Sequence, residues 1–213
     1  MGNETIAMQE DDPVGDERIY SAACERNRQP ILSVLQDVLP TRGRVLEIAA
    51  GTGMHAAYFA HSLPGLEWIP TDPDPEARRS IEAWRRDADA PFLQAARTLD
   101  TRDEDWGVAD VDAILCCNMI HISPWESCRG LFRGADHVLA PEGLVVTYGP
   151  YFFPGAPPVP SNEAFDRSLR ARDPEWGVRQ IDDVTEVARD WGFARERTLA
   201  LPANNHVVVW RRA

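Results

Sequence analysis

Segments with the composition of β-strands alternate with segments of helical periodicity along most of this chain, and this order restricts the possible folds more than any other feature. Helices are expected over residues 22–39, 54–63, 75–88, 124–139 and 183–191. Strands are expected over residues 44–50, 66–71, 95–99, 111–117 and 144–148. Because strands that alternate with helices form a parallel sheet covered on both faces, the sequence predicts an α/β, Rossmann-like fold.

Three segments depart from this alternation. Residues 1–17 are acidic and aperiodic, and they are predicted to form a flexible tail ahead of a single domain over 18–213. Residues 150–177 are rich in proline and aromatic side chains, and we expect them to lie over the carboxyl edge of the sheet as a lid-like insertion. Extended runs at 194–201 and 206–211 flank the turn Pro202–Asn205, which predicts an antiparallel C-terminal hairpin and seven strands in all.

Composition excludes several classes of function. The formal net charge of -12 makes a nucleic acid an unfavourable partner, because an acidic surface repels phosphates. All 22 lysine-or-arginine positions are arginine, which excludes Schiff-base and lysine-nucleophile mechanisms. No run approaches the roughly 18 consecutive apolar residues of a membrane span, and the N-terminus lacks the pattern of a secretion signal. We therefore expect a cytoplasmic monomer or homodimer without a membrane partner, whose four cysteines are free thiols.

A glycine turn follows the first predicted strand, in the segment Glu47–Gly53 with the sequence Glu-Ile-Ala-Ala-Gly-Thr-Gly. The small residues Ala49, Gly51 and Gly53 allow a ligand to approach the backbone, and the glycines tolerate positive φ. The predicted helix that follows offers unpaired N–H groups at its start. Glu47 lies inside the strand, where an unpaired carboxylate is costly, so we expect a ligand amine, or backbone and water hydrogen bonds, to satisfy it.

Two further acids close predicted strands. Asp72 follows the second strand, about 20 residues after the glycine turn, which suits a carboxylate that accepts hydrogen bonds from ribose hydroxyls. Asp100 follows the third, where a carboxylate can accept from an adenine amine. Open parallel sheets bind ligands beyond the carboxyl ends of their strands. Each aspartate alone could cap a turn, but Glu47, Asp72 and Asp100 together predict a nucleoside-bearing cofactor.

A nicotinamide-dependent dehydrogenase is the competing interpretation, because it shares the glycine turn and the acid after the second strand. The third glycine of that motif is Ala56 in this chain, which the motif tolerates. The acid within the strand at Glu47, the third acid at Asp100 and the predicted antiparallel hairpin all favour S-adenosylmethionine instead.

At these residues the chain resembles the methyltransferase-like 26 family of small class I methyltransferases, formerly a domain of unknown function. The resemblance runs from about residue 19 to the end of the chain. The matching stretches are Glu25–Asn27 with Pro30–Leu32, the glycine turn with His55–Ala57, Asn118–Pro124, Gly130–Phe132, Thr147–Tyr151, Ser161–Asn162, Asp173–Gly177 and Pro202–Asn205. The sequence departs from the family pattern at Ala50, inside the glycine turn, and at Ala90–Leu93, before the third predicted strand.

The resemblance implies a seven-stranded class I methyltransferase fold and S-adenosylmethionine as the cofactor. By the same resemblance, the cofactor contacts are expected at Glu47, Gly51, Gly53, Asp72 and Asp100. It implies little about the methyl acceptor.

The residues after the fourth and fifth predicted strands are the candidates for catalysis. Asn118 is expected to contact the cofactor, and His121 could serve as a general base or merely orient its loop by hydrogen bonds. Tyr148 and Tyr151 could contact the acceptor or only form the wall of its pocket.

Residues outside the strand ends complete the candidate site. In the first helix, Arg26 and Asn27 could close over the methionine carboxylate of the cofactor, although pairing on the helix surface is an equal alternative. Asn204 and Asn205 are interpreted as turn residues. No His-Glu-x-x-His or comparable cluster occurs, so no metal site is predicted.

Methyl transfer from a sulfonium is an in-line displacement that requires a positioned acceptor. The aromatic residues of 151–176 favour a small, partly apolar acceptor methylated on oxygen, nitrogen or sulfur. A non-catalytic protein of the same fold, which binds the cofactor or acts as a partner subunit, is the main alternative. A nucleotide-dependent oxidoreductase is the other.

Overall fold

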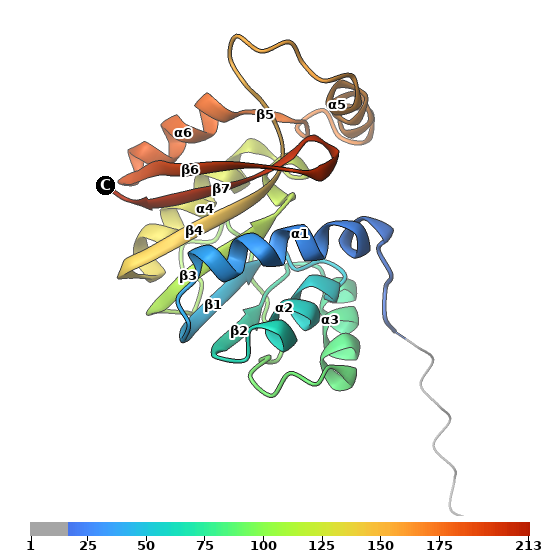
Figure 1. Ribbon diagram of the computed structural model, residues 1–213, viewed down its shortest axis with the longest axis vertical. Helices are drawn as coiled ribbons and strands as arrows, with labels where there is room; N and C mark the ends of the chain where they lie inside the picture. The colour runs from blue at the N-terminus through green and yellow to red at the C-terminus, as the bar shows by residue number, and fades with distance from the viewer. Residues whose placement is uncertain (1–16) are drawn as a thin grey trace, which may run out of the picture.

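In the computed structural model, which describes residues 17–213, a seven-stranded sheet forms the centre of the molecule (Figure 1). Its order is β2-β1-β3-β4-β7-β6, with β5 paired to β4. The strands are β1 Gly43–Ile48, β2 Leu66–Pro70, β3 Val111–Cys117, β4 Leu139–Phe152, β5 Arg179–Gln180, β6 Phe193–Leu201 and β7 Asn205–Arg212. The pairs among β1 to β5 are parallel, whereas β7 pairs antiparallel with β4 and β6, which confirms the predicted fold and hairpin.

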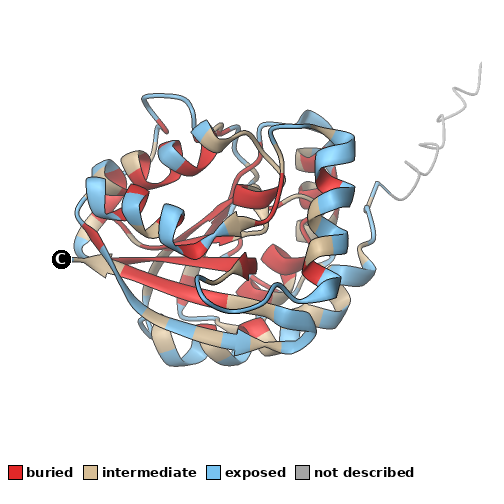
Figure 2. Ribbon diagram, turned by 90° about the horizontal axis from the view of Figure 1, so that it is seen from above, coloured by how far each residue is buried: buried red, intermediate tan, exposed pale blue. Residues whose placement is uncertain are grey.

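Helices cover both faces of this sheet, and two apolar clusters hold them there. On one face, α1 and α2 pack Leu32, Leu35 and Phe59 onto Val45 and other strand residues. On the opposite face, α4 and α6 form a second cluster with the strands. Buried residues gather on the strands and on the sides of the helices that face them (Figure 2). The helices are α1 Ala22–Val38, α2 Met54–Ser62, α3 Pro75–Asp87, α4 Trp125–Val138, α5 Pro160–Arg172 and α6 Ile181–Asp190, with short 3-10 turns η1 Met119–His121 and η2 Pro202–Asn204. No helix among the described residues is long and apolar enough to cross a membrane.

The predicted third strand over 95–99 is wrong. This segment runs along the open edge of β2, but it contacts that edge only through isolated bridges, Trp68 with Leu93 and Thr71 with Arg97. The bridge at Arg97 has the usual parallel bonds, since Arg97 N–H donates to Pro70 O while Asp72 N–H donates to Arg97 O, but the register shifts by one residue between the two bridges. Only Leu99 of the segment is fully buried, so too few apolar side chains face the core to hold a regular strand. The seventh strand is instead the short β5.

The proline-rich segment 150–177 contains regular structure that the sequence did not predict. β4 continues through Tyr151 to Phe152, and α5 occupies Pro160–Arg172. Pro160 stands in the first turn of α5, where its missing N–H removes no intrahelical hydrogen bond. The predicted tail over residues 1–17 lies, apart from Glu17, outside the described residues.

All four cysteines are free thiols. Cys116 belongs to the cluster under α4 and α6, whereas Cys117 packs against the cluster under α1 and α2. Adjacent strand residues point to opposite faces of the sheet, and for this reason the two neighbouring thiols cannot pair with each other.

Candidate functional site

The glycine turn connects β1 to α2 at the carboxyl edge of the sheet, and it is bonded to the end of β2. Ala50 N–H donates to Thr71 O at 2.8 Å, and Thr71 Oγ1 donates to Glu47 O at 2.8 Å. Ala49 and Gly51 both adopt left-handed conformations, with φ of +51° and +57°. Such a conformation strains a residue that carries a Cβ, as Ala49 does, and strain of this kind gathers at functional sites.

Gly53 caps α2 with a φ of +83°, and its backbone lies against α3. A Cβ at this position would approach Ile81 Cα to 2.6 Å. Both the left-handed conformation and this close approach require glycine.

We expect Gly53→Ala to lower the free energy of unfolding by roughly 1–2 kcal/mol, through backbone strain together with crowding against α3. Urea unfolding followed by circular dichroism measures this. Gly192→Ala is the matched control, because Gly192 has a φ of +77° with no atom near the added methyl. Equal losses in the two variants would show that the contact with Ile81 contributes nothing.

Asp72 ties the glycine turn to the start of α3. Its carboxylate accepts from Gly51 N–H at 2.9 Å through Oδ2 and from Asp74 N–H at 2.9 Å through Oδ1. The residue is only 6% exposed, and burial raises the pKa of its carboxyl above the usual value despite these two hydrogen bonds. Each oxygen retains acceptor capacity, because a carboxylate oxygen accepts more than one hydrogen bond.

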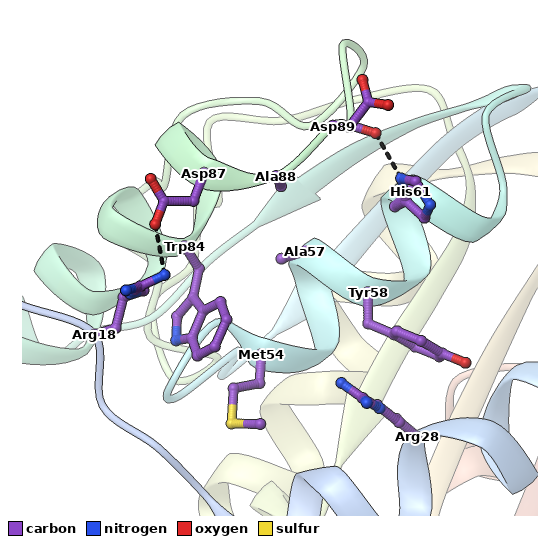
Figure 3. A pocket seen from close by; sticks show the side chains of 10 residues that line it. All are labelled: Arg18, Arg28, Met54, Ala57, Tyr58, His61, Trp84, Asp87, Ala88 and Asp89. Atoms are coloured by element: carbon purple, nitrogen blue, oxygen red, sulfur yellow. Dashed lines mark hydrogen bonds and ion pairs between the residues drawn. The ribbon is translucent and has the colours of Figure 1, made fainter.

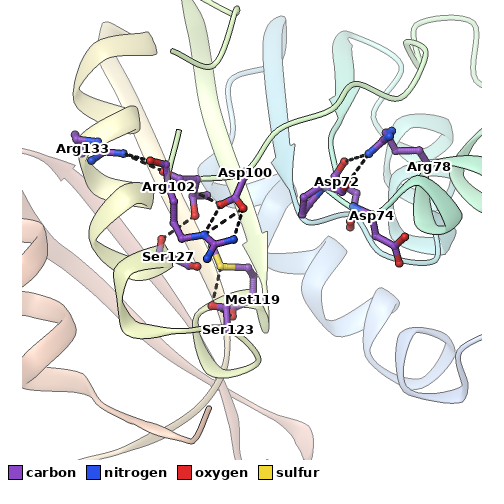
Figure 4. A network of polar contacts seen from close by, with 11 residues as sticks. Asp72, Asp74, Arg78, Asp100, Arg102, Met119, Ser123, Ser127 and Arg133 are labelled. Atoms are coloured by element: carbon purple, nitrogen blue, oxygen red, sulfur yellow. Dashed lines mark hydrogen bonds and ion pairs between the residues drawn. The ribbon is translucent and has the colours of Figure 1, made fainter. Parts of the chain in front are cut away.

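Asp100 lines a cavity together with Asp72. It is paired with an arginine two residues later (Figure 4). Arg102 donates to both carboxylate oxygens, from Nε at 3.0 Å to Oδ1 and from Nη2 at 2.6 Å to Oδ2. This hydrogen-bonded pairing lowers the pKa of Asp100, which therefore stays ionised at neutral pH. Arg102 itself is exposed, so the pair can rearrange without uncovering buried surface.

Asp72 and Asp100 line one cavity of about 260 Å³ at the ends of β1 and β2. Apolar side chains form its other walls, and Trp176 reaches it from the segment after α5. The residues that line it include Ile48, Ala49, Leu99, Met119, Ile122 and Pro124. Two acids over apolar walls suit a flat, partly polar group with hydroxyls or amines at its edges.

Glu47 lies beneath the glycine turn and is not part of the cavity wall. It is 1% exposed, and its Oε2 accepts a hydrogen bond from Trp68 Nε1 at 2.6 Å. Desolvation raises the pKa of this carboxyl to about 8, an effect that the Trp68 bond opposes and the nearby Asp72 charge reinforces. The hydrogen-bond partner of this carboxyl in the structure is thus an indole N–H.

Glu47 faces the α1 side of the sheet, where several polar side chains lie close to the glycine turn. Asn27 Oδ1 lies 2.8 Å from His55 Nε2, and the Asn27 side chain also hydrogen-bonds Tyr148. Desolvation lowers the pKa of His55 to about 4, so its ring is neutral. Arg26, by contrast, is exposed, and it makes no ion pair with any residue in 17–213.

His121 is fully buried behind the end of β4. Its Nδ1 accepts from Arg179 N–H at 3.3 Å, and its Nε2 is buried without a hydrogen-bond partner. Desolvation and, secondarily, the Arg179 charge lower its pKa to about 3. The ring occupies the space that a side chain at position 149 would fill, since a Cβ on Gly149 would meet His121 Nε2 at 2.5 Å and Asn118 Oδ1 at 3.3 Å.

Tyr148 and Tyr151 do not come together. Tyr148 packs in the cluster under α1 and α2, whereas Tyr151 belongs to the opposite cluster and stacks edge-on against His121. The Tyr151 hydroxyl donates to Thr147 Oγ1 at 2.8 Å, and burial raises its pKa. Asn118 follows β3 in a left-handed conformation, and its N–H donates to Tyr148 O at 2.7 Å.

Sequence reasoning did not name Trp68, Arg102 and Met119 as residues of this region. Arg102 and Met119 could have been anticipated, because Arg102 lies two residues after Asp100 and Met119 directly follows Asn118. Trp68 contacts Glu47 only through the pairing of β1 with β2, and no local signal predicts that contact. Among residues 17–213, no three histidine, cysteine or acidic side chains are close enough together to hold a metal ion.

A second hollow lies outside this region, between α2, α3 and the start of the described chain (Figure 3). Arg18 pairs there with Asp87, and His61 Nδ1 lies 2.7 Å from Asp89 O. None of the three acids and no glycine of the turn lines it, so this hollow is separate from the candidate site.

The sheet order, the terminal antiparallel pair and the glycine turn together define the class I methyltransferase fold. Solved structures agree at the level of the fold. The SAH-bound form of CalO1, a methyltransferase in calicheamicin biosynthesis, matches with a TM-score of 0.69 and 16% identity, over 88% of this chain and 54% of that one. Mitomycin 7-O-methyltransferase MmcR matches with a TM-score of 0.74 and 17% identity, over 90% and 55% of the two chains. This chain thus spans about half the length of either protein.

A shorter structure, the PH0226 protein from Pyrococcus horikoshii, matches with a TM-score of 0.66 and 16% identity over 91% of this chain and 92% of that one. Within this class, the chain belongs to the DUF938 family, described as a protein of unknown function, whose sequence model matches residues 18–212.

Proposed function

We propose that this protein binds S-adenosylmethionine at the glycine turn and transfers its methyl group to a small molecule. The observation that carries the proposal is the convergence of Asp72 and Asp100 on one cavity beside that turn. The fold of the solved methyltransferases supports it. On the strength of the matching stretches, we further propose that the chain falls within the methyltransferase-like 26 group.

The adenosine part of the cofactor is assigned to the cavity between the two aspartates. Asp72 would accept hydrogen bonds from the ribose hydroxyls, and Asp100 from the adenine amine. Met119 and Ile48 offer apolar surface for the base. To bind the adenine amine, the Asp100 carboxylate would have to accept from the amine as well as from Arg102, or its bonds to Arg102 would have to break. We propose that Trp176 and the rest of segment 150–177 exclude water from this cavity.

The methionine part is assigned to the α1 side of the glycine turn. A carboxyl whose pKa is raised to about 8 is mostly protonated at neutral pH, so Glu47 would ionise when a cationic amine approaches. Asn27 lies next to this group, and the exposed Arg26 on the same helix is available for the methionine carboxylate. Asn118 is assigned to the cofactor on the β3 side.

When bound, the sulfonium supplies an activated methyl carbon, and the chain's own residues orient the acceptor and keep out water. We propose that His121 positions the end of β4 rather than acting as a general base. Its Nδ1 lone pair is directed at Arg179 N–H, and its pKa near 3 makes it a poor proton acceptor. Tyr151 supports the same wall, while Tyr148 contributes to the methionine side through Asn27.

Isothermal titration calorimetry with S-adenosylmethionine, S-adenosylhomocysteine and NAD tests the cofactor. We expect one-to-one binding of both adenosyl compounds and none of NAD. Binding of NAD alone would favour the oxidoreductase interpretation, and binding of none of the three would overturn the proposal. Detection of methylated products by mass spectrometry then separates an enzyme from a non-catalytic binder of the same fold.

A further inference from the structure

Another cavity, of about 290 Å³, lies between the end of β4, the start of α5 and the β6–β7 hairpin, and we call it the hairpin cavity. The tip of the hairpin lies beside α5 (Figure 1), and Asn162 Nδ2 donates to Asn204 O at 3.1 Å across the contact. The hairpin cavity shares no lining residue with the cavity that holds Asp72 and Asp100. Nothing in the assignment of the cofactor uses it.

The walls of the hairpin cavity are aromatic and uncharged. Tyr151, Phe153 and Pro157 line it, and no aspartate, glutamate or arginine is among its lining residues. The hydroxyl of Tyr151 is committed to Thr147, so this side chain offers ring surface rather than a hydrogen bond. A charged ligand would lose its hydration here without gaining a counter-charge, so the cavity selects for neutral, flat molecules.

One buried polar atom in these walls is left without a partner, His206 Nδ1. The three asparagine amides of the wall donate within the protein, since Asn162 bonds Asn204 O, Asn204 bonds Ser161 Oγ, and Asn205 bonds the carbonyls of the hairpin turn. The His206 ring packs against Phe153 with its centroid 4.6 Å away. An unpaired buried nitrogen is costly, and a turn of the ring about its Cβ–Cγ bond would present it to a ligand hydroxyl or N–H in the cavity.

The hairpin cavity is connected through the end of β4 to Asn118, which is assigned to the cofactor. His206 stands opposite Gly149 in the β4–β7 ladder, and Gly149 contacts Asn118 and His121. Neighbouring strands are separated by about 4.8 Å. A molecule in the hairpin cavity therefore lies beside the end of β4, at the same edge of the sheet as the glycine turn.

We propose that the hairpin cavity is the acceptor subsite, and that it takes a neutral aromatic molecule whose hydroxyl or N–H donates to His206 Nδ1. The role as acceptor subsite rests on the proposed methyl transfer. The binding of a neutral aromatic molecule in the hairpin cavity does not require the cofactor. The acceptor class is thus an uncharged phenol or heteroaromatic N–H compound, and not a carboxylate, a phosphate or a protein side chain on a large surface.

Fluorescence titration with 2-naphthol tests this directly, with 2-naphthoate as the charged comparator. The wild-type protein is expected to bind 2-naphthol at least tenfold more tightly than 2-naphthoate. Ala200→Phe fills the hairpin cavity from an exposed position of β6, and we expect it to weaken 2-naphthol binding at least tenfold. Ala194→Phe is the matched control on the same strand, away from the cavity, and is expected to bind as the wild type does.

His206→Phe keeps a ring against Phe153 but removes the nitrogen. We expect this variant to lose about fivefold in affinity for 2-naphthol while its affinity for naphthalene is unchanged. Wild-type affinity for 2-naphthol in Ala200→Phe, or a preference for 2-naphthoate, would overturn the proposal.

Calorimetry with S-adenosylmethionine on the same variants keeps the two proposals apart. All of them are expected to bind the cofactor like the wild type. A protein that binds 2-naphthol in the hairpin cavity but no S-adenosylmethionine refutes the cofactor assignment alone. The reverse result refutes the acceptor subsite alone.

Discussion

Asp72→Ala is expected to weaken the binding of S-adenosylmethionine by about 100-fold, which corresponds to roughly 2.7 kcal/mol. The substitution removes the acceptor assigned to the ribose hydroxyls. It also releases the Gly51 and Asp74 N–H groups that the carboxylate holds at 2.9 Å, so the glycine turn loses its tie to α3. Calorimetry at pH 7.5 measures the affinity. Asp72→Asn retains one acceptor oxygen, so its affinity should lie between those of the wild type and Asp72→Ala.

Asp74→Ala is the control for local damage near the start of α3. Asp74 caps that helix by accepting from Glu76 N–H at 2.9 Å, and its loss should cost about 1 kcal/mol of stability. Its affinity for the cofactor should nevertheless match the wild type. If Asp72→Ala bound as tightly as the wild-type protein, the ribose would have to lie elsewhere.

Glu47→Gln is expected to abolish a pH dependence that the wild-type protein shows. With a pKa of about 8, Glu47 is mostly protonated at pH 6, so binding a cationic amine must expel this proton. The affinity of the wild-type protein for S-adenosylmethionine should therefore rise about tenfold between pH 6 and 7, with release of one proton. Glu47→Gln should bind weakly and equally at both values. Calorimetry in buffers of different ionisation enthalpy counts the proton.

The same buried carboxyl governs stability in the absence of ligand. The folded protein retains the Glu47 proton up to about pH 8, whereas the unfolded chain releases it near the usual value of 4.5. The contribution of this group to the free energy of unfolding is therefore fully present below pH 4.5 and is lost as the pH rises towards 8. In the wild-type protein, this fall in the free energy of unfolding is on the order of 2–4 kcal/mol between pH 5 and 8. We expect it to be absent in Glu47→Gln.

Glu67→Gln provides the comparison for Glu47, because Glu67 lies on β2, partly exposed, with its carboxylate 3.4 Å from Arg44. It should leave both the pH profile of binding and the stability unchanged. A wild-type affinity that is flat from pH 6 to 7 would show that Glu47 does not face the cofactor amine.

Several features of the site followed from local sequence patterns. The glycine turn, Asp72 and Asp100 were predicted to share one edge of the sheet, and the last two do line one cavity. The segment before Asp100 is not a strand, yet it runs along β2 and still carries Asp100 to that edge. The sequence is also sufficient to predict that Tyr148 and Tyr151 point in opposite directions, because residues three apart on a strand face opposite sides of the sheet. The structure places them in the two opposite apolar clusters.

Other features depended on contacts between segments far apart in the sequence. The bond from Trp68 to Glu47 requires the register of β1 on β2, and Trp176 reaches the cavity only through the path of the chain after α5. His121 follows β3 as expected, but its burial depends on Tyr151, Gly149 and Arg179 closing around it. Local periodicity carries no information about such neighbours.

The sequence by itself determined the α/β class, the succession of strand, glycine turn and helix, and the positions of the acids, because periodicity and turn residues act over a few neighbouring positions. Only the tertiary structure decided which side chains are desolvated and what each one contacts. Burial and partners set the pKa of Glu47 near 8 and that of His121 near 3, and they leave His206 Nδ1 unpaired in the hairpin cavity. Desolvation and pairing belong to the packed molecule, since both depend on atoms that distant parts of the chain bring together.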